Sequence, residues 1–486
     1  MGSAPKTVLF LTSPEYGQAN VVLATAQELA RSPECNVYIA SFASLQQRVD
    51  DINARNKNLA KPITFVNIPG LSAVVSAQRH LGDTSTWAHP PGFLPAAKSY
   101  KGVEYLLMGD SPAGYIQTYH ACLQIMKDLK PAAVICDLLL IPAHDATREL
   151  KLDYIIISPC SGKEVVGTAM PGMPMMFKWP MQSSGMSYPL STVQKLKNVA
   201  LFMCFAYSVI LGPMFAKIRK ARTEAGIKHQ SPMYDMYQKR HLYIASHLPE
   251  ADWDELRETP SNLVVCGPII MPSLQDDTAS GRDLLKWLSQ QPTVMVNLGS
   301  LQGAVGPSSL AIARGLQKAL DLNKEIQILW KLKYDWANDR DMAPLLNPHV
   351  ETGRLRIISW LDIEPSTLLQ TGHICCSVHH GGANSFYEAC RAGIPQLVVP
   401  IWWDTYEYAE RAKYHRIGAI GNPGVAPSVD PEFFGSELVR VLGDADIKRR
   451  AAEVGAACER RGEGREIAAD AILKWMHGHV RIATEE

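Results

Sequence analysis

The chain has 486 residues, which exceeds the size of one hydrophobic core and predicts two domains of about 200 residues or more each. At 47% hydrophobic and 20% charged residues, its composition is that of a globular protein rather than a disordered one. Forty-eight basic residues balance 48 acidic ones, which gives no indication of a nucleic-acid partner or an anionic-membrane partner. Any ligand must therefore be recognised by local features.

The ten cysteines are scattered, and no CxxC pair or Cys/His ladder with metal-ligand spacing occurs. Cys136, Cys266 and Cys376 lie inside apolar runs, where a free thiol behaves as a small hydrophobic side chain. The first residues run directly into a strand pattern, without the features of a secretion signal. We therefore expect a reducing, cytoplasmic location.

The first half of the chain alternates short apolar runs with helical stretches, and a helix is expected over residues 18–31. Wholly apolar strands separated by helices predict a parallel sheet covered on both faces. Long irregular inserts occupy residues 72–97 and the methionine-rich residues 167–189; the second insert either covers an apolar substrate or packs as a structural loop. The expected strands span residues 8–11, 37–40, 63–66, 133–136 and 154–157.

Residues 199–216 form an uncharged apolar segment with basic residues on both sides. Its length reaches the lower limit for a membrane span, but Ser208, Gly212 and Pro213 and the basic residues at both ends argue against one. Three interpretations remain open: a helix that lines an internal apolar pocket, a peripheral contact with a membrane surface, or a true span. We expect the first.

The strand and helix pattern restarts in the second half, with strands expected over residues 293–298, 327–331, 355–358, 374–378 and 396–399. The chain therefore divides into a first domain over residues 1–261, a linker over 262–281, a second domain over 282–460 and a C-terminal segment over 461–486. In parallel sheets, ligands bind outside the carboxyl ends of the strands, which predicts a central cleft between two doubly wound halves. We expect a helix in the last segment. The sequence does not decide whether this helix packs against the first domain.

The most informative motif follows the apolar run 374–378. It reads His380-Gly381-Gly382 and continues through Asn384 and Ser385 to Glu388, before a second apolar run. This order predicts a strand, a glycine turn and a helix, whose first N–H groups and dipole favour a phosphate. Glu388 lies on the same helix face as Asn384 and Ser385, so it can reach past the phosphates to a sugar hydroxyl. The motif predicts a diphosphate-linked ligand.

With these residues, the chain resembles the UDP-dependent glycosyltransferases of family 1, particularly the fungal members. The resemblance covers nearly the whole chain and implies the GT-B fold, an α/β architecture of two doubly wound Rossmann-like domains facing a central cleft. It also implies inverting transfer of a hexose, most simply glucose, to a small apolar acceptor such as a phenolic compound, a polyketide or a sterol of secondary metabolism. The signature consists of Trp360, His380, Gly381, Gly382, Asn384, Ser385, Glu388, Gly393, Pro395, Pro400 and Asp404.

The resemblance also implies roles for individual donor-binding residues. Trp360 stacks on the uracil, where a flat ring offers apolar area at little entropic cost. His380, in its glycine turn with Gly382, contacts the β-phosphate. The α-phosphate is contacted by Asn384 and Ser385, and the ribose by Glu388.

Four further positions bear on the donor. Ser300 matches another phosphate contact, and Asp404 matches the carboxylate that binds hydroxyls of the transferred sugar. Thr405 replaces a glutamine that plant relatives carry after this aspartate, and Ile363 replaces another glutamine near the ribose, so the choice of sugar stays open. The alternative for Trp360 is a position in the hydrophobic core. For His379, we expect such a core position.

The acceptor half departs from the family pattern. Family members usually carry a histidine base after the first strand, whereas this chain has Gln18, which cannot act as a base near neutral pH. Asp137 matches the aspartate that normally holds this histidine. We expect Asp137 itself to be the base, which suits an acidic phenol and would also suit a C-glycoside formed by a ring carbon. Open alternatives are another base, namely Glu15, Tyr16, His80 or His89, or a sugar-nucleotide sensor with little activity.

No cofactor and no metal is expected, because the phosphate charge can be stabilised by His380 and the helix start. The pair Asp444 and Asp446 resembles a metal-binding DxD motif, but its position predicts a helix N-cap instead. A nicotinamide oxidoreductase is disfavoured, because no GxGxxG follows the first strand.

Overall fold

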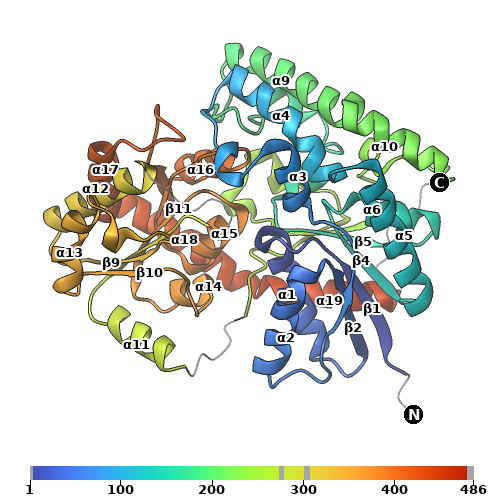
Figure 1. The fold of residues 1–486 in the computed structure, drawn as a ribbon, viewed down its shortest axis with the longest axis horizontal. Helices are drawn as coiled ribbons and strands as arrows, with labels where there is room; N and C mark the ends of the chain where they lie inside the picture. Colours follow the sequence, from blue (N-terminus) through green and yellow to red (C-terminus); the bar gives the residue numbers. More distant parts are fainter. Residues whose placement is uncertain (1–3, 273–277, 300–306, 479–486) are drawn as a thin grey trace.

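The computed structural model describes residues 4–272, 278–299 and 307–478. They form two α/β domains side by side, each built on a sheet in which all paired strands are parallel (Figure 1). Every strand expected from the sequence is present. The first sheet has the order β3 (Thr64–Asn67), β2 (Cys35–Ser41), β1 (Lys6–Leu11), β4 (Ala133–Asp137), β5 (Ile155–Ser158), β6 (Leu242–Ala245) and β7 (Leu263–Val265).

Helices cover both faces of this sheet. On one face, α1 (Tyr16–Ala30) and α2 (Gln46–Arg55) bury apolar side chains against the strands, and on the other face α5 (Pro112–Leu129) and α6 (Ile141–Glu149) do the same. Strands that are apolar on both sides require this arrangement, because neither face can be left in water.

The second sheet has the order β10 (Leu355–Ile358), β9 (Gln327–Lys331), β8 (Thr293–Asn297), β11 (Ile374–His379), β12 (Gln396–Val398) and β13 (Gly418–Ile420). One face carries α12 (Pro307–Leu322), α13 (Ala343–Glu351) and α17 (Pro431–Gly443). The other carries α11 (Ala279–Leu288), α14 (Pro365–Leu369), α15 (Ala383–Ala392), α16 (Thr405–Tyr414) and α18 (Ala445–Arg461). The short strands β6, β7 and β13 were not among the strands expected from the sequence.

Two chain segments cross the expected domain boundaries. β7 pairs with β6, so the first sheet extends past residue 261 into the range expected to be linker. The last described helix, α19 (Gly464–Met476), packs on α1, and Arg465 binds Glu28 at 2.9 Å. The first domain is therefore completed by the end of the chain.

The apolar segment 199–216 forms parts of two helices, α9 (Thr192–Leu211) and α10 (Pro213–Glu224), which are separated at Gly212. α9 lies along the outer edge of the first domain (Figure 1), and its outward side chains are exposed. On its inner side, Leu201 packs in an apolar cluster with Tyr100 and Met181. A role of this helix in lining an apolar pocket stays a prediction. The insert 167–189 packs against this region, with Trp179 and Met181 buried.

Candidate active site

The expected glycine turn lies at the carboxyl end of β11, between the two domains. Gly381 has φ +92°, and a Cβ atom at this position would lie 2.7 Å from the carbonyl oxygen of Thr405. The turn therefore requires glycine for two reasons, its left-handed backbone and its close contact with the chain before α16. The strand, turn and helix predicted from the motif are all present.

His380 is enclosed by two glycines. A Cβ atom on Gly299 or Gly382 would lie 2.8 Å or 2.7 Å, respectively, from atoms of the imidazole ring. Burial, together with the nearby His379 and Lys331, lowers the pKa of His380 to about 3, so the ring is neutral near pH 7. Its Nδ1 atom is buried without a hydrogen-bond partner among the described residues. A neutral imidazole with a free ring nitrogen can donate a hydrogen bond to a phosphate oxygen.

α15 begins directly after this turn. Gly382 is its N-cap and has no side chain that can cap the first N–H groups, which therefore stay available to a ligand. Asn384 and Ser385 lie in the first turn, as expected. The Nδ2 atom of Asn384 is 3.3 Å from the carbonyl oxygen of Tyr16, the first residue of α1. The donor helix therefore touches the first domain at this point.

Lys331 is a cation of this site that the sequence analysis missed. It ends β9, and its Nζ atom lies 3.4 Å from the carbonyl oxygen of Gly299 and 4.3 Å from the centre of the Trp360 ring. Burial, followed by repulsion from Lys333, lowers its pKa. The available signal was its place at the carboxyl end of a predicted parallel strand, where ligands bind.

Trp360 is not a core residue, because 47% of its surface is exposed. Its ring meets the edge of the Tyr16 ring at a centroid distance of 5.9 Å, and Arg48 lies over Tyr16. An exposed indole at a domain boundary is available for stacking. The alternative of a core tryptophan is therefore wrong.

Glu388 lies on the inner face of α15 and is buried. No hydrogen bond to its carboxyl group is present within the described ranges, and burial, followed by repulsion from Glu364, raises its pKa to about 8. A buried carboxyl without a partner is costly unless a ligand binds it. This environment suits a group that receives ligand hydroxyls.

Asp404 is the N-cap residue of α16. Burial, followed by repulsion from Glu164, raises its pKa to about 7. The hydroxyl of Thr405 accepts the N–H groups of Ile401 and Trp402 at 3.1 and 3.0 Å and donates to the Trp402 carbonyl. Thr405 therefore shapes the turn that carries Asp404, and its contact with the donor stays a prediction.

Two further expectations for the second domain concern Ser300 and His379. Ser300 lies outside the described residues. His379 is buried in the strand, where its Nε2 atom bonds Gln396 at 2.8 Å and its Nδ1 atom accepts the Gly381 N–H at 3.1 Å. His379 thus has the expected structural position.

Asp137 ends β4 on the opposite side of the cleft. Its Oδ2 atom accepts the N–H of Ser13 at 3.1 Å and the hydroxyl of Thr12 at 3.4 Å, and Oδ1 accepts the N–H of Leu139 at 3.0 Å. Burial nevertheless raises the pKa of Asp137 to about 6, because desolvation outweighs these donors. The carboxylate is held in one orientation and titrates close to neutral pH, as a general base requires.

Gln18 does not pair with Asp137 through any hydrogen bond between described residues, and its buried Oε1 atom has no partner. Gln18 therefore does not replace the missing histidine as a hydrogen-bond partner of Asp137. An amide with a free acceptor atom can still bind a hydroxyl group.

The other candidate bases have structural contacts. His89 uses both ring nitrogens, one toward the Pro90 carbonyl at 2.9 Å and the other toward the Trp403 N–H at 3.4 Å. His80 stacks on Tyr105 and bonds the Asp110 carbonyl at 2.7 Å. Glu15 accepts the N–H of Val74 at 3.0 Å with Oε1, while its Oε2 atom is buried without a hydrogen-bond partner among the described residues. Tyr16 lies between the Trp360 ring and the Arg48 guanidinium.

The chain just before Asp404 contacts the first domain, where the N–H of Ser183 donates to the Trp403 carbonyl at 2.8 Å. Cys160 follows β5 in the first domain. Burial raises the pKa of its thiol, and Glu164, Asp404 and Asp137 each raise it further through their charge.

A buried network of ion pairs joins the domains beside this region. Lys163, after β5, binds Glu407 of α16, and Arg411 of α16 binds both Glu407 and Asp252 of the first domain. All four side chains are at most 2% exposed. The sequence analysis missed this network, since only the tertiary structure brings these segments together.

No group of three or more His, Cys, Asp or Glu side chains that could hold a metal is present in the described part of the chain. Asp444 accepts the N–H groups of Asp446 and Ile447 at 3.0 and 3.1 Å, so it caps α18 as expected. The DxD resemblance therefore reflects helix capping.

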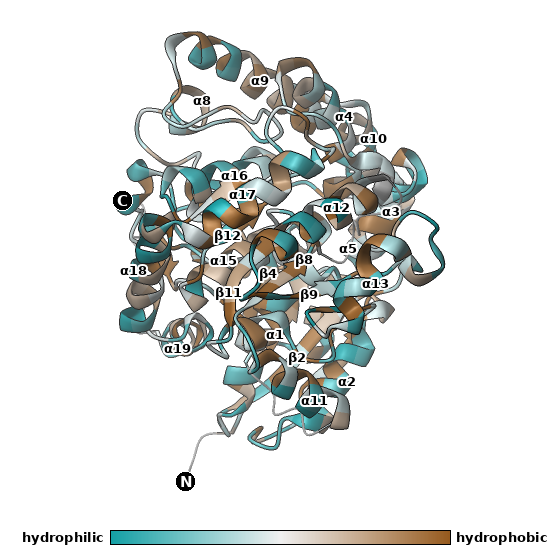
Figure 2. Cartoon of the chain, turned by 90° about the vertical axis from the view of Figure 1, so that its left-hand side faces the viewer, coloured by the Kyte–Doolittle hydropathy of each residue, from teal (hydrophilic) through white to brown (hydrophobic). Residues whose placement is uncertain are grey.

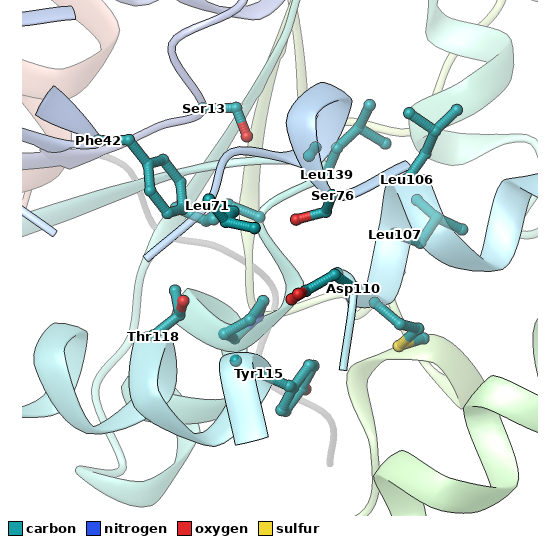
Figure 3. A pocket seen from close by; sticks show the side chains of 16 residues that line it. Ser13, Phe42, Leu71, Ser76, Leu106, Leu107, Asp110, Tyr115, Thr118 and Leu139 are labelled. Atoms are coloured by element: carbon teal, nitrogen blue, oxygen red, sulfur yellow. The ribbon is translucent and has the colours of Figure 1, made fainter. Parts of the chain in front are cut away.

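A small pocket adjoins Asp137 in the first domain (Figure 3). Ser13 and Leu139, whose N–H groups bind Asp137, are both in its wall. The hydroxyl of Ser13 is buried and has no hydrogen-bond partner among the described residues. The remaining lining is mostly apolar and includes Phe42, Leu71, Leu106, Leu107, Met108 and Leu140.

Known proteins resemble the chain in sequence and in fold. Residues 348–473 match the C-terminal domain of the family described as erythromycin biosynthesis protein CIII-like. The glycosyltransferase sdnJ of Sordaria araneosa is 32% identical, with 97% of this chain and 98% of that protein aligned. UDP-glucuronosyltransferase 3A1 of Bos taurus is 22% identical over 68% of this chain and 66% of its own length.

Two solved structures show the same fold at low sequence identity. UGT71G1 of Medicago truncatula, complexed with UDP-glucose, superposes with a TM-score of 0.66 at 15% identity and covers 98% of both chains. A transferase of Siraitia grosvenorii in complex with UDP gives 0.62 at 14% identity, covering 97% of this chain and 99% of its own. The predicted GT-B fold is confirmed. The chain therefore belongs to the UDP-dependent glycosyltransferases of family 1 and is an enzyme that transfers a sugar from a UDP-sugar.

Proposed function

We propose that the enzyme transfers a hexose, with glucose as the first donor to test, from a UDP-sugar to a small apolar acceptor that carries an acidic hydroxyl group. A phenolic compound or an aromatic polyketide of fungal secondary metabolism has this chemistry. The observation that carries the proposal is the place of Asp137, which is held by the N–H groups of Ser13 and Leu139 beside the small pocket of the first domain.

The donor side is supported by the polar groups around the glycine turn. The free ring nitrogen of His380, the amino group of Lys331 and the first N–H groups of α15 can bind a diphosphate. Negative charge grows on the β-phosphate as the sugar leaves, and fixed donors stabilise it most at that moment. We therefore propose that transfer needs neither a metal nor a cofactor.

On the acceptor side, Asp137 takes the proton of the acceptor hydroxyl. The oxygen forms a bond to the anomeric carbon while the bond from that carbon to the β-phosphate oxygen breaks, and UDP leaves with the electron pair. Attack from the first domain and departure into the second invert the anomeric centre. A phenol needs little assistance, because its pKa of about 10 is far below that of an aliphatic alcohol.

The choice of glucose is supported by Asp404, which lies where the family places its sugar-binding carboxylate, and by the UDP-glucose in the Medicago structure. The ten cysteines are all free, which supports a reducing, cytoplasmic location. An O-glycoside is the expected product; attack by a ring carbon would give a C-glycoside instead, and acid hydrolysis separates the two, because a C-glycoside resists it.

The test is UDP release from UDP-glucose with a panel of phenols and aromatic polyketides, with the products identified by mass. We expect turnover with at least one acceptor and none with Asp137→Ala, while the UDP affinity of that variant stays within a few-fold of wild type. Tight UDP binding without turnover on any acceptor would support the sensor alternative instead.

A further inference from the structure

The outward face of α9 is unusually apolar for a surface helix. Its exposed large side chains are Val193, Leu196, Met203, Tyr207 and Leu211, and they are between 58% and 72% exposed. Their spacings of three, seven, four and four residues place them on one side of the helix. The opposite side packs against α4 (Phe93–Met108) and α8 (Pro174–Phe177). α9 thus presents an apolar stripe to the outside.

The neighbouring elements extend this surface. Eight of the fifteen large apolar side chains that are exposed in the described part of the chain belong to α4, α8 and α9 or to the residue that precedes α8. Figure 2 shows α8 and α9 together at one end of the molecule. We call these residues the α9 face: Leu94, Met173, Phe177, Val193, Leu196, Met203, Tyr207 and Leu211.

The charged residues around the α9 face are mostly basic. Between Glu164 and Glu224 the chain contains no aspartate or glutamate at all. The exposed basic residues on α4, α9 and α10 are Lys98, Lys101, Lys195, Lys197, Lys217, Arg219 and Lys220. Of these, Lys220 pairs with Glu224 at 3.8 Å. An exposed apolar stripe beside basic residues complements an anionic lipid surface, where cations meet headgroups and apolar side chains enter the acyl boundary.

α9 cannot cross a bilayer without leaving its domain, although by length and composition its segment qualifies as a span. Asn198, on its inner side, is fully buried and donates to the carbonyls of Met176 and Trp179 at 3.0 and 2.9 Å, and it accepts the Met181 N–H at 2.8 Å. These bonds would be lost in the lipid interior, where unpaired polar groups are costly. The helix is therefore fixed with its apolar stripe outward.

We propose that the α9 face binds the surface of an anionic phospholipid bilayer, with α9 parallel to the membrane plane. α4 connects this face to the pocket beside Ser13: its first turn carries Leu94 of the α9 face, and its last residues, Leu106 to Met108, line the pocket about 18 Å farther along the helix axis.

The experiment is flotation of the purified full chain with vesicles of phosphatidylcholine alone or with added phosphatidylserine. We expect the wild type to float with the anionic vesicles, less at high salt, and to bind neutral vesicles more weakly. The double variant Leu196→Asp/Met203→Asp should lose at least ten-fold in binding. The double variant Lys195→Ser/Lys197→Ser should weaken binding to anionic vesicles by about five-fold per lysine.

The matched control is Leu322→Asp, which changes an equally exposed leucine at the end of α12, in the second domain, and should bind like wild type. Unchanged thermal unfolding shows that each variant is folded. Absence of wild-type binding to both vesicle types overturns the proposal, and so does wild-type binding by Leu196→Asp/Met203→Asp. A concentration-dependent dimer that this variant abolishes would assign the face to a second copy instead. None of these measurements depends on sugar transfer, so they are independent of the proposed reaction.

Discussion

The side-chain amide of Asn384 lies 3.3 Å from the backbone carbonyl oxygen of Tyr16. Asn384 belongs to the first turn of α15 in the second domain, and Tyr16 is the first residue of α1, two residues before Gln18. This contact joins the start of the helix that can bind the donor diphosphate to the start of the helix that carries Gln18 at the usual histidine position.

Asp137 should control the pH dependence of transfer. Its pKa of about 6 lies above the usual value of an aspartate, so at lower pH the carboxyl group is protonated and cannot accept the acceptor proton. We expect kcat/KM to rise through pH 6 and reach a plateau above it, measured with a phenol whose own pKa lies well above the range. Asp137→Asn keeps an oxygen for the Leu139 N–H but should lose at least 100-fold in kcat. An unchanged pH profile in an active Asp137→Asn variant would remove Asp137 from the base role.

Lys331 should contribute to the affinity for UDP. Its amino group lies beside the Gly299 carbonyl and Trp360, and an ion pair with a phosphate in a partly buried site is worth about 1.5–3 kcal/mol. Calorimetry of Lys331→Ala should therefore show about 10- to 150-fold weaker UDP binding. Lys333→Ala, an exposed lysine two residues on, is the matched control and should bind UDP like wild type. Equal affinities of both variants would place the diphosphate elsewhere.

Glu388 should affect donor binding and the pH dependence of stability. Glu388→Ala should weaken UDP binding, because it removes the ribose contact; an unchanged affinity contradicts that contact.

In the unliganded protein, the folded pKa of Glu388 is about 8 and exceeds the unfolded value of 4.5, so the folded state binds more protons between these pH values. Its contribution to stability is present below about pH 4.5 and is lost as the pH rises toward 8. As the pH rises over this range, the Tm of Glu388→Gln should therefore fall less than the Tm of the wild type.

The buried pair of Lys163 and Glu407 should hold the two domains together. Lys163→Met leaves the Glu407 carboxylate with fewer partners inside the protein, and breaking such a pair costs about 3–5 kcal/mol. Denaturant unfolding should show this loss. Lys220→Met, which removes an exposed pair with Glu224, is the control and should change stability by at most about 1 kcal/mol. Similar values for both variants would show that the domain interface does not depend on the buried pair.

Removal of divalent metals should leave transfer intact. His380, Lys331 and the start of α15 already provide donors for the diphosphate, so a metal is not required to neutralise it. Initial rates with an excess of EDTA should equal those without it. A loss of activity that Mg²⁺ or Mn²⁺ restores would show that a metal takes part in donor binding.

Several features of the site could be predicted from the sequence, because they depend only on residues that are neighbours in the chain. The order of strand, glycines and helix after residue 374 is determined by neighbouring residues, and Asp137 directly ends an apolar strand. The observed β11, α15 and β4 agree with these expectations. The hydrogen bonds of the Thr405 hydroxyl to the preceding turn could not be predicted, because sequence position does not reveal them, and its contact with the donor stays a prediction.

By itself, the sequence determined the two parallel sheets, the diphosphate-binding turn and the residue that replaces the usual histidine. Apolar runs and glycines act over short distances, so their order in the chain is sufficient. Only the tertiary structure decided that Lys331 joins the donor site, that Lys163 binds Glu407 across the domains and that α9 faces outward. These relationships depend on which surfaces pack together, and packing joins side chains that lie far apart in the chain, such as Lys163 and Glu407, which are separated by 244 residues.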